Sequence, residues 1–314
     1  MTLILSEKDV EGLINMNDVV CCVEEALRRH GEGGVSNFMR TRSRGTGSVL
    51  NVMHANLSYL RRGGLKAYMS SRKGTKFALL LFDTNDAQLL AVRGADSLGR
   101  FRTGAASAVA TKFLYGRPSG TLAVFGSGKQ ALTQVLAVRE VMSLDEVRVW
   151  SPTLGHRRAF AQKLKTYGVN GSAFDSPDTA IDGAEVATAI TSSEEPFLTG
   201  EMLESVSHLN IAGGNVPERA EITPAAVGAF DTVVVDDLAQ AKTEYGDLIQ
   251  AANDGFFSWE SAVELGAVVA GRRKPKGRTL FKSGGAALED VAVASMIYDR
   301  AMQSGRSYPG VELV

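Results

Sequence analysis

The sequence has almost no cysteine, with two residues among 314, and these two, Cys21 and Cys22, are adjacent. Neighbouring cysteines cannot build an ordinary disulfide framework, and no CxxC pair or histidine cluster accompanies them, so we expect reduced thiols and no metal site. The chain also lacks an excess of charge, because 34 basic and 35 acidic residues leave a formal charge of -1. This balance argues against a nucleic-acid or membrane surface.

Long apolar runs are missing as well. No apolar stretch reaches 18 residues, and residues 1–13 lack the basic flank and long apolar core of a signal peptide. We therefore expect a cytoplasmic protein. With 44% hydrophobic and 22% charged residues the composition is that of a globular protein, and the length allows two domains.

Two different patterns predict the secondary structure. Residues 48–94 alternate between apolar and polar side chains and are interrupted by turns that carry Gly, Asn or Asp, which predicts a mostly antiparallel sheet. From Thr121 onward, short apolar strands such as TLAVFG and EVRVWS alternate with helices. This alternation is typical of a parallel, doubly wound sheet, so we predict an α/β fold with a Rossmann-type domain.

A glycine-rich turn joins the first of these strands to its helix, in the stretch TLAVFGSGKQALTQVLAV at residues 121–138. Gly126, Gly128 and Ala131 fit the pattern G-x-G-x-x-G/A, in which backbone N–H groups at a helix N-terminus bind the pyrophosphate of a dinucleotide. The pattern alone is a weak signal, but its strand-turn-helix context predicts a nicotinamide or flavin nucleotide as cofactor.

Four motifs occur in a distinctive order: GLK at 64–66, RFRTGAASAVATKFL at 100–114, AVFGSGKQA at 123–131 and LFKSGGAALEDVAVASMIYDRA at 280–301. With these motifs the chain resembles the ornithine cyclodeaminase / μ-crystallin family across nearly its whole length. That family includes ornithine and lysine cyclodeaminases, archaeal alanine dehydrogenases and imine reductases. Its members move a hydride between a nicotinamide and the α-carbon of an amino or imino acid.

The resemblance implies two domains and a homodimer. Residues 1–117, with residues 280–314 returning to them, would form an α+β domain for substrate binding and dimerisation. Residues 118–279 would form the Rossmann-like domain that binds NAD or NADP. The expected partner is a small amino or imino acid, with neither nucleic acid nor membrane involved.

The resemblance also assigns substrate-binding residues. Arg102, in the RT pair, and Arg40 would hold the substrate carboxylate, since a guanidinium is a planar two-pronged donor; Arg42 is a near competitor of Arg40. Lys66 would lie beside the imino nitrogen, where a buried lysine with a lowered pKa can donate a proton. Arg72, in a basic cluster after Lys66, could bind a second carboxylate, as in iminosuccinate.

Asn215 departs from the family pattern. Cyclodeaminases and alanine dehydrogenases carry an aspartate there, which acts as a base on the amine or on the attacking water, whereas asparagine cannot accept a proton at neutral pH. Some imine-reducing relatives, such as μ-crystallin, also lack this aspartate. Asn215 is thus a catalytic candidate that favours imine reduction or amino-acid dehydrogenation. A cyclodeaminase that makes proline from ornithine and a non-catalytic nucleotide-binding protein stay open as alternatives.

The choice between NAD and NADP depends on the second strand of the nucleotide domain. This strand ends in Ser151, where an acidic residue would bind the ribose 2′-hydroxyl of NAD and repel the phosphate of NADP. Ser151, Thr153 and Arg157 could hold that phosphate, which leans the prediction slightly to NADP. The remaining residues predicted to bind the cofactor are Thr103, Gly126, Ser127, Gly128, Lys129, Gln130, Thr191, Ser192, Ser283 and Gly284.

Overall fold

The computed structural model describes residues 1–312, which form two compact units. Unit 1 contains residues 1–102 and the C-terminal segment from Gly285, and unit 2 contains Thr103–Gly284. The domain boundary expected from the sequence falls after residue 117. In the structure the boundary lies within helix α3 (Asp96–Leu114), since the first turns of this helix, including Arg102, belong to unit 1.

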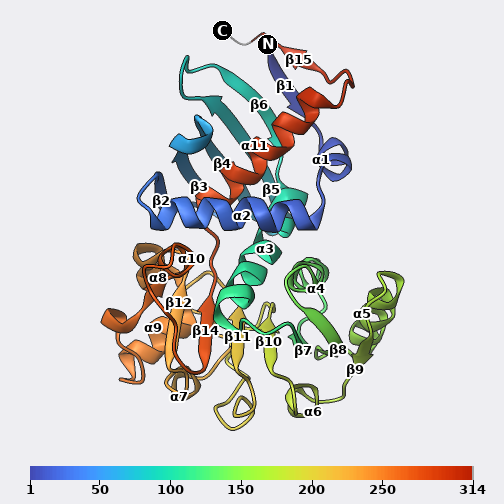
Figure 1. The fold of residues 1–314 in the computed structure, drawn as a ribbon, viewed down its shortest axis with the longest axis vertical. Coiled ribbons are helices and arrows are strands. Elements are labelled where there is room, and N and C mark those ends of the chain that lie inside the picture. The colour runs from blue at the N-terminus through green and yellow to red at the C-terminus, as the bar shows by residue number, and fades with distance from the viewer. Residues whose placement is uncertain (313–314) are drawn as a thin grey trace. The chain divides into compact units, whose positions relative to one another are not determined.

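Unit 1 is built around a seven-stranded sheet of order β15-β1-β6-β5-β4-β3-β2 (Figure 1). All neighbours from β2 to β6 pair antiparallel, which agrees with the alternation in residues 48–94, while β1 pairs parallel with β6. The strands are β1 (Thr2–Leu5), β2 (Val35–Gly45), β3 (Ser48–Leu57), β4 (Arg62–Ser71), β5 (Gly74–Asp83), β6 (Leu89–Gly94) and β15 (Gly310–Val311).

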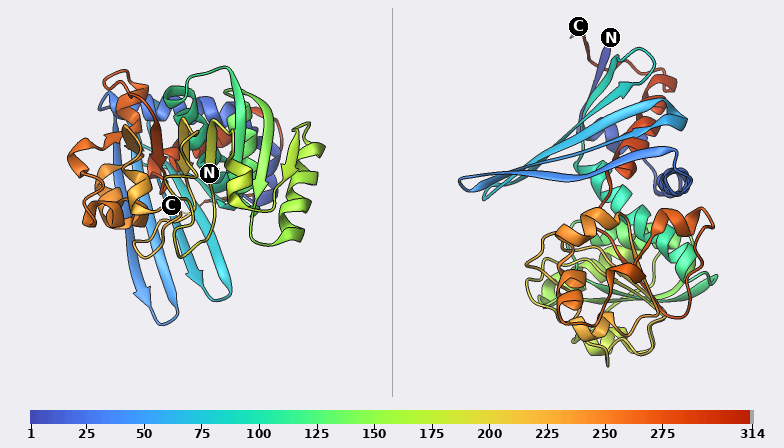
Figure 2. Two further views of the ribbon diagram at one scale, coloured as in Figure 1. Left: turned by 90° about the horizontal axis from the view of Figure 1, so that it is seen from below. Right: turned by 90° about the vertical axis from the view of Figure 1, so that its left-hand side faces the viewer.

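Helices α1 (Glu7–Leu13), α2 (Met16–Gly31) and α11 (Ala287–Gln303) belong to the same unit, and α2 and α11 pack on one face of the sheet (Figure 2). Ser6 begins α1 through a capping box with Asp9. Asn15 caps α2, whose buried residues Val19, Val23 and Leu27 recur every four positions and face the interior. The sequence therefore determines both helix starts locally.

The register of the hairpins places Lys66 on the covered face. Met53 of β3 lies opposite Lys66 of β4, which lies opposite Leu79 of β5, which lies opposite Arg93 of β6. Residues directly opposite one another project from the same face of a sheet, so these four side chains form one row. All four are buried.

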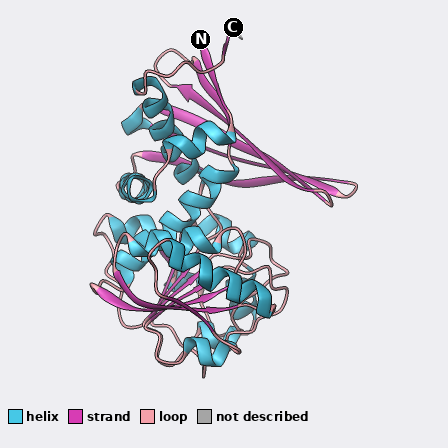
Figure 3. Cartoon of the chain, turned by 90° about the vertical axis from the view of Figure 1, so that its right-hand side faces the viewer, coloured by secondary structure: helices cyan, strands magenta, loops and turns pink. Residues whose placement is uncertain are grey.

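Unit 2 is a doubly wound α/β domain with an eight-stranded sheet of order β13-β12-β14-β11-β10-β7-β8-β9, and every pair in it is parallel. Helices lie on both sides of these strands (Figure 3). The strands are β7 (Ser119–Phe125), β8 (Ser143–Trp150), β9 (Gly171–Ala173), β10 (Val186–Ala189), β11 (His208–Ile211), β12 (Thr232–Val235), β13 (Val263–Glu264) and β14 (Thr279–Lys282).

The helices of unit 2, besides the rest of α3, are α4 (Ala131–Arg139), α5 (Leu154–Thr166), α6 (Pro177–Ile181), α7 (Pro224–Val227), α8 (Leu238–Glu244), α9 (Gly246–Asn253) and α10 (Leu265–Val269). The strand order reverses at β7, because β8 and β9 lie on one side of it and β10 on the other. Open α/β sheets bind ligands beyond the carboxyl ends of the strands at such a switch point. The topology alone therefore directs attention to the segment after β7.

Candidate active site

The glycine turn after β7 has the geometry of a phosphate-binding turn. Gly126 has a φ of +115°, and a Cβ there would lie 2.5 Å from the carbonyl oxygen of Ile190, so only glycine fits without strain. A Cβ on Gly128 would meet nothing within 4 Å, which leaves open space above this backbone. Helix α4 follows at Ala131, and its N-terminal N–H groups complete an arrangement suited to an anion.

A cavity of about 730 Å³ opens beside this turn, within the range of small-molecule sites. Nine residues predicted to bind the cofactor line it: Gly126, Ser127, Gly128, Lys129, Gln130, Ser151, Thr153, Thr191 and Ser192. The sequence analysis missed Trp150, Pro152, His156, Ile190, Ser193, Phe197 and Gly213. Most of these follow the ends of β8, β10 and β11, so their place at the strand ends was the signal that could have identified them.

The residues present fit a dinucleotide. The open space at Gly128 admits a pyrophosphate, and none of the described residues that line the cavity is Asp or Glu. Ser151, at the end of β8, accepts a hydrogen bond of 2.9 Å from the Ser127 hydroxyl and leaves the ribose position without an acid. These features admit both NAD and NADP.

Arg157 of helix α5 is turned toward the backbone of the loop that precedes this helix. Its guanidinium donates to the carbonyl oxygen of Ser151 at 3.1 Å and pairs with the Asp175 carboxylate at 2.8 Å, and the side chain is buried. It does not line the cavity, whereas His156, its neighbour in the sequence, does. Helix α5 therefore directs the side chain of His156 into the cavity and that of Arg157 toward the loop backbone, which it stabilises.

Glu221 ties two walls of the cavity together. Its carboxylate accepts hydrogen bonds from the Thr191 N–H at 2.7 Å, the Thr191 hydroxyl at 2.7 Å and the Gly213 N–H at 2.9 Å. Burial raises the pKa of this carboxyl, while Lys282 opposes the increase. Sequence reasoning gave no signal for Glu221, because its partners are the backbone groups of distant strand ends.

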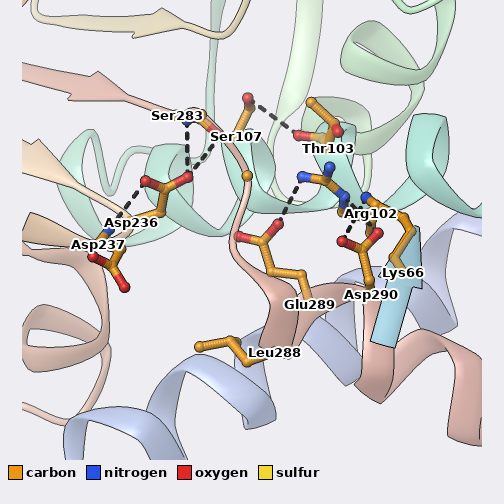
Figure 4. A network of polar contacts seen from close by, with 12 residues as sticks. Lys66, Arg102, Thr103, Ser107, Asp236, Asp237, Ser283, Leu288, Glu289 and Asp290 are labelled. Atoms are coloured by element: carbon orange, nitrogen blue, oxygen red, sulfur yellow. Dashed lines mark hydrogen bonds and ion pairs between the residues drawn. The ribbon is translucent and has the colours of Figure 1, made fainter. Parts of the chain in front are cut away.

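Ser283 and Gly284 lie in the loop after β14, where they are held by Asp236. The Ser283 hydroxyl and the Gly284 N–H donate to one Asp236 oxygen at 3.2 and 2.9 Å (Figure 4). Thr103, in α3, accepts a hydrogen bond at its carbonyl oxygen from the Gln134 amide at 3.4 Å. None of these three predicted residues lines the cavity of unit 2.

Asn215 lies in a hollow of about 530 Å³ that shares Gly213 with the first cavity. Glu194, Glu218 and Arg219 also line it, so carboxylates are present beside the asparagine.

Unit 1 contains a buried cluster of charged side chains (Figure 4). The Lys66 ammonium bonds one oxygen of Asp290 at 2.6 Å, and the Arg102 Nε bonds the other at 3.0 Å. Arg102 also pairs with Glu289 through Nη1 at 3.0 Å. Lys66, the predicted proton donor, and Arg102, a predicted substrate-binding residue, are thus joined by an acid that the sequence analysis did not single out.

Burial and the neighbouring charges shift the pKa values of Lys66 and Asp290. Burial and the neighbouring Arg102 lower the pKa of Lys66 to about 8, although Asp290 counteracts them. Burial alone would raise the pKa of Asp290, but Arg102 and Lys66 hold it below its ordinary value. Lys66 therefore lies near the pKa that suits proton transfer at neutral pH.

Arg40 belongs to the buried interior of unit 1 and Arg72 does not. Arg40 lies within the register shift of β2 between Phe38 and Thr41 and donates through Nη2 to the carbonyl oxygen of Gly285 at 3.4 Å, whereas Arg42 is less buried. Arg72 lies in the exposed turn between β4 and β5, six residues beyond Lys66, about 20 Å along an extended strand. The structure does not bring Arg72 to the cluster of Lys66, Arg102 and Asp290.

No helix within residues 1–312 is long and apolar enough to cross a membrane. The same residues contain no group of three or more His, Cys, Asp or Glu side chains that could hold a metal ion.

Comparison with known sequences gives matches along nearly the whole chain. The model of the ornithine cyclodeaminase/mu-crystallin family matches residues 1–305. An alanine dehydrogenase of Archaeoglobus fulgidus is 30% identical over 314 residues, covering 96% of this chain and 95% of that protein. A ketimine reductase mu-crystallin of Macropus fuliginosus is 30% identical over 312 residues, covering 94% of this chain and 96% of its own.

Solved structures match the fold closely. Thermococcus litoralis Delta(1)-pyrroline-2-carboxylate reductase, in complex with NADH and L-proline, has a TM-score of 0.92 at 28% identity and covers 99% of this chain and all of its own. An archaeal alanine dehydrogenase dimer with bound NAD has a TM-score of 0.92 at 27% identity, and the match covers 100% of this chain and 99% of that chain. Iminosuccinate reductase of Paracoccus denitrificans, with NAD+, has a TM-score of 0.87 at 26% identity, over 97% of each chain. The predicted α/β fold is confirmed.

Proposed function

The chain belongs to the ornithine cyclodeaminase/mu-crystallin family, and from this premise we propose that it is an oxidoreductase that interconverts a small α-imino acid and the L-amino acid. The observation that carries the proposal is the buried cluster in which Lys66, its pKa lowered to about 8, lies beside the Arg102 guanidinium. A proton donor and a carboxylate-binding group are the two functions that imine reduction requires of the protein.

Each residue of the cluster has a distinct task. Arg102, whose Nε and Nη1 bond Asp290 and Glu289, supplies with Arg40 the positive charge that binds the substrate carboxylate. Lys66 donates its proton to the imino nitrogen and so makes the α-carbon a better hydride acceptor. With a pKa of about 8, Lys66 is mostly protonated at neutral pH and can still release its proton. A nicotinamide bound in the cavity of unit 2 supplies hydride chemistry.

For the cofactor we propose NAD(H), in place of the slight lean to NADP. Arg157, the cationic candidate for a 2′-phosphate, is committed to the Ser151 carbonyl and to Asp175 and does not line the cavity. Three structures of relatives contain NAD or NADH.

Asn215 supports reduction over deaminating cyclisation, because its amide cannot take a proton from an amine or from water. The substrate class that fits is a cyclic or linear imine with one carboxylate, such as Delta(1)-pyrroline-2-carboxylate. A dicarboxylic imine such as iminosuccinate is the second candidate, supported by the iminosuccinate reductase among the relatives, although the exposed Arg72 lies far from Lys66.

We further propose that two copies associate through the face of the unit 1 sheet that α2 and α11 leave uncovered. Phe38, Leu50 and Met69 on β2–β4 are 54%, 37% and 44% exposed, and Phe38 stacks on His54 with ring centroids 4.6 Å apart. Phe38 and His54 also line a hollow of about 560 Å³ on this sheet. An apolar patch of this kind marks an interaction site, and an alanine dehydrogenase relative is a dimer.

The test is a panel of imino acids with NADH and NADPH supplied separately, followed by the absorbance of the reduced nicotinamide. We expect turnover with NADH, and a loss of about 100-fold or more in kcat for Lys66→Met. Lys8→Met, which removes an exposed lysine from helix α1 of the same unit, is the matched control and keeps wild-type turnover. Ammonia release from L-ornithine without imine reduction would show a cyclodeaminase instead, and NADH binding without any turnover would show a binding protein.

A further inference from the structure

The two oxygens of Asp290 are bonded to two different proposed active-site cations. Its Oδ2 accepts from the Lys66 ammonium at 2.6 Å and its Oδ1 from the Arg102 Nε at 3.0 Å. The side chains of Lys66, Asp290 and Arg102 are 3%, 1% and 9% exposed. Water therefore contributes little to their solvation, and each charge depends on the others.

The position of Asp290 is itself fixed by contacts along α11. Asp290 lies in the first turn of this helix, where a negative charge is favoured by the helix dipole. The Leu288 N–H donates to the Asn37 side chain of β2 at 3.0 Å, and Arg93 of β6 donates to the Ala294 carbonyl oxygen, one turn further along, at 2.7 Å. Contacts on both sides of Asp290 thus anchor the helix to the sheet that carries Lys66.

The surroundings of Lys66 contain few other charges. Arg102 comes from α3, Arg40 from β2 and Asp290 from α11, and the Tyr68 ring lies 6.0 Å from the ammonium on its own strand. The residues opposite Lys66 on the two adjacent strands, Met53 and Leu79, are apolar. Two cations oppose the charge of Lys66, and Asp290 is the anion bonded to it.

We propose that Asp290 is a positioning residue, which holds the Lys66 ammonium charged and places it beside Arg102, where the substrate carboxylate binds. The inference rests on the proposed function, because it concerns the proton donor of that reaction. It has a consequence for the substrate complex. A carboxylate bound at Arg102 adds a negative charge near Lys66, offsets the effect of the guanidinium and raises the pKa of Lys66. Substrate binding therefore favours the protonated donor.

The experiment compares Asp290→Asn with Glu289→Gln. Both substitutions replace a buried carboxylate of the same helix turn by its amide, but Asp290 bonds Lys66 and Arg102 whereas Glu289 is bonded to Arg102. The pKa of Lys66 is read directly by NMR of 13C-labelled lysine, with Lys66→Met identifying the signal, in protein without substrate. We expect this pKa to fall by about one unit or more in Asp290→Asn and by clearly less in Glu289→Gln.

The pH dependence of imine reduction is the second readout. Because the protonated lysine is the active form, the rate falls above its pKa, and the alkaline limb should move to lower pH in Asp290→Asn by the same amount as the NMR value. In the wild type, the alkaline pKa in kcat should exceed that in kcat/KM, since the first reports the complex and the second the free enzyme. Asp290→Glu, which restores the charge, should recover most of the pKa of Lys66.

An unchanged Lys66 pKa in Asp290→Asn, or equal shifts in both amide variants, would overturn the proposal. If Asp290→Asn does not fold, Asp290→Glu decides: a Lys66 pKa near the wild-type value with a lowered kcat supports positioning by Asp290, and an unchanged kcat contradicts it. Failure of the proposed function looks different, because wild-type protein would then reduce no imine while the NMR titration still reported the coupling of Lys66 to Asp290.

Discussion

Substitution by alanine should have different effects at the two glycines of the turn after β7. We expect Gly126→Ala to lower the stability of the fold and Gly128→Ala to lower the affinity for NADH. In Gly126→Ala, the new methyl group forces an L-residue to a φ of +115° and lies 2.5 Å from the Ile190 carbonyl oxygen. The backbone strain costs about 1–2 kcal/mol and the overpacking about 1–3 kcal/mol, so we expect a loss of about 3 kcal/mol in the free energy of unfolding. For a unit of this size that corresponds to a fall of about 10 °C in Tm.

In Gly128→Ala, the methyl group meets no atom within 4 Å, and its φ is not left-handed. The Tm should stay within about 2 °C of wild type. The same methyl group occupies the open space that a pyrophosphate needs, so we expect NADH affinity to fall by about tenfold or more, which is about 1.4 kcal/mol.

Thermal unfolding followed by circular dichroism and titration with NADH followed by nicotinamide fluorescence measure the two effects separately. Each variant serves as the control of the other, because they add the same methyl group two residues apart. A Gly126→Ala protein that melts with the wild type would refute the steric argument. A Gly128→Ala protein that binds NADH with wild-type affinity would refute the assignment of this turn to the dinucleotide.

Two further predictions concern buried groups of unit 2. In Glu221→Gln, an NH2 group replaces one of the two carboxylate oxygens that accept hydrogen bonds from Thr191 and Gly213. We expect NADH affinity to fall by about tenfold. An unchanged Kd would show that the two loops hold the cavity without Glu221. Burial lowers the pKa of His208 to about 4, so this ring stays neutral in the folded protein while the unfolded chain binds a proton below pH ~6.5. The free energy of unfolding should therefore decrease by up to about 3 kcal/mol as the pH falls from ~6.5 to ~4. Urea unfolding should show a smaller decrease over this range for His208→Gln. The same dependence of stability on pH in both proteins would contradict this reasoning.

Local patterns were sufficient for the features that depend on local backbone geometry. The glycine turn, the strand before it and the helix after it are adjacent in the chain, so their spacing predicts the cavity wall from Gly126 to Gln130. Alternation in β3 predicts its buried face, because successive residues of a strand point to opposite sides. The parallel alternation from Thr121 likewise indicated the doubly wound sheet that the structure contains.

Those patterns could not predict which way a side chain points within a helical turn. His156 and Arg157 lie in the first turn of α5, and Arg157 was the residue expected to hold a phosphate. The register of α5 instead turns its guanidinium to the Ser151 carbonyl and to Asp175, while His156 faces the cavity. A rotation of about 100° per helical residue separates these two neighbours, and no composition rule contains that angle.

The sequence by itself determined the parallel α/β fold and the glycine turn, because each depends on short-range patterns, and its resemblance to a family supplied Lys66, Arg40 and Arg102 as candidates. Only the tertiary structure decided how the charges are paired. Asp290 is 224 residues from Lys66 and 188 from Arg102, yet it bonds both. The register of the hairpins places Lys66 on the sheet face that α11 covers, and Asp290 lies in the first turn of α11. Because both side chains are buried, the charge of the lysine depends on this carboxylate, although the two residues are far apart in the chain.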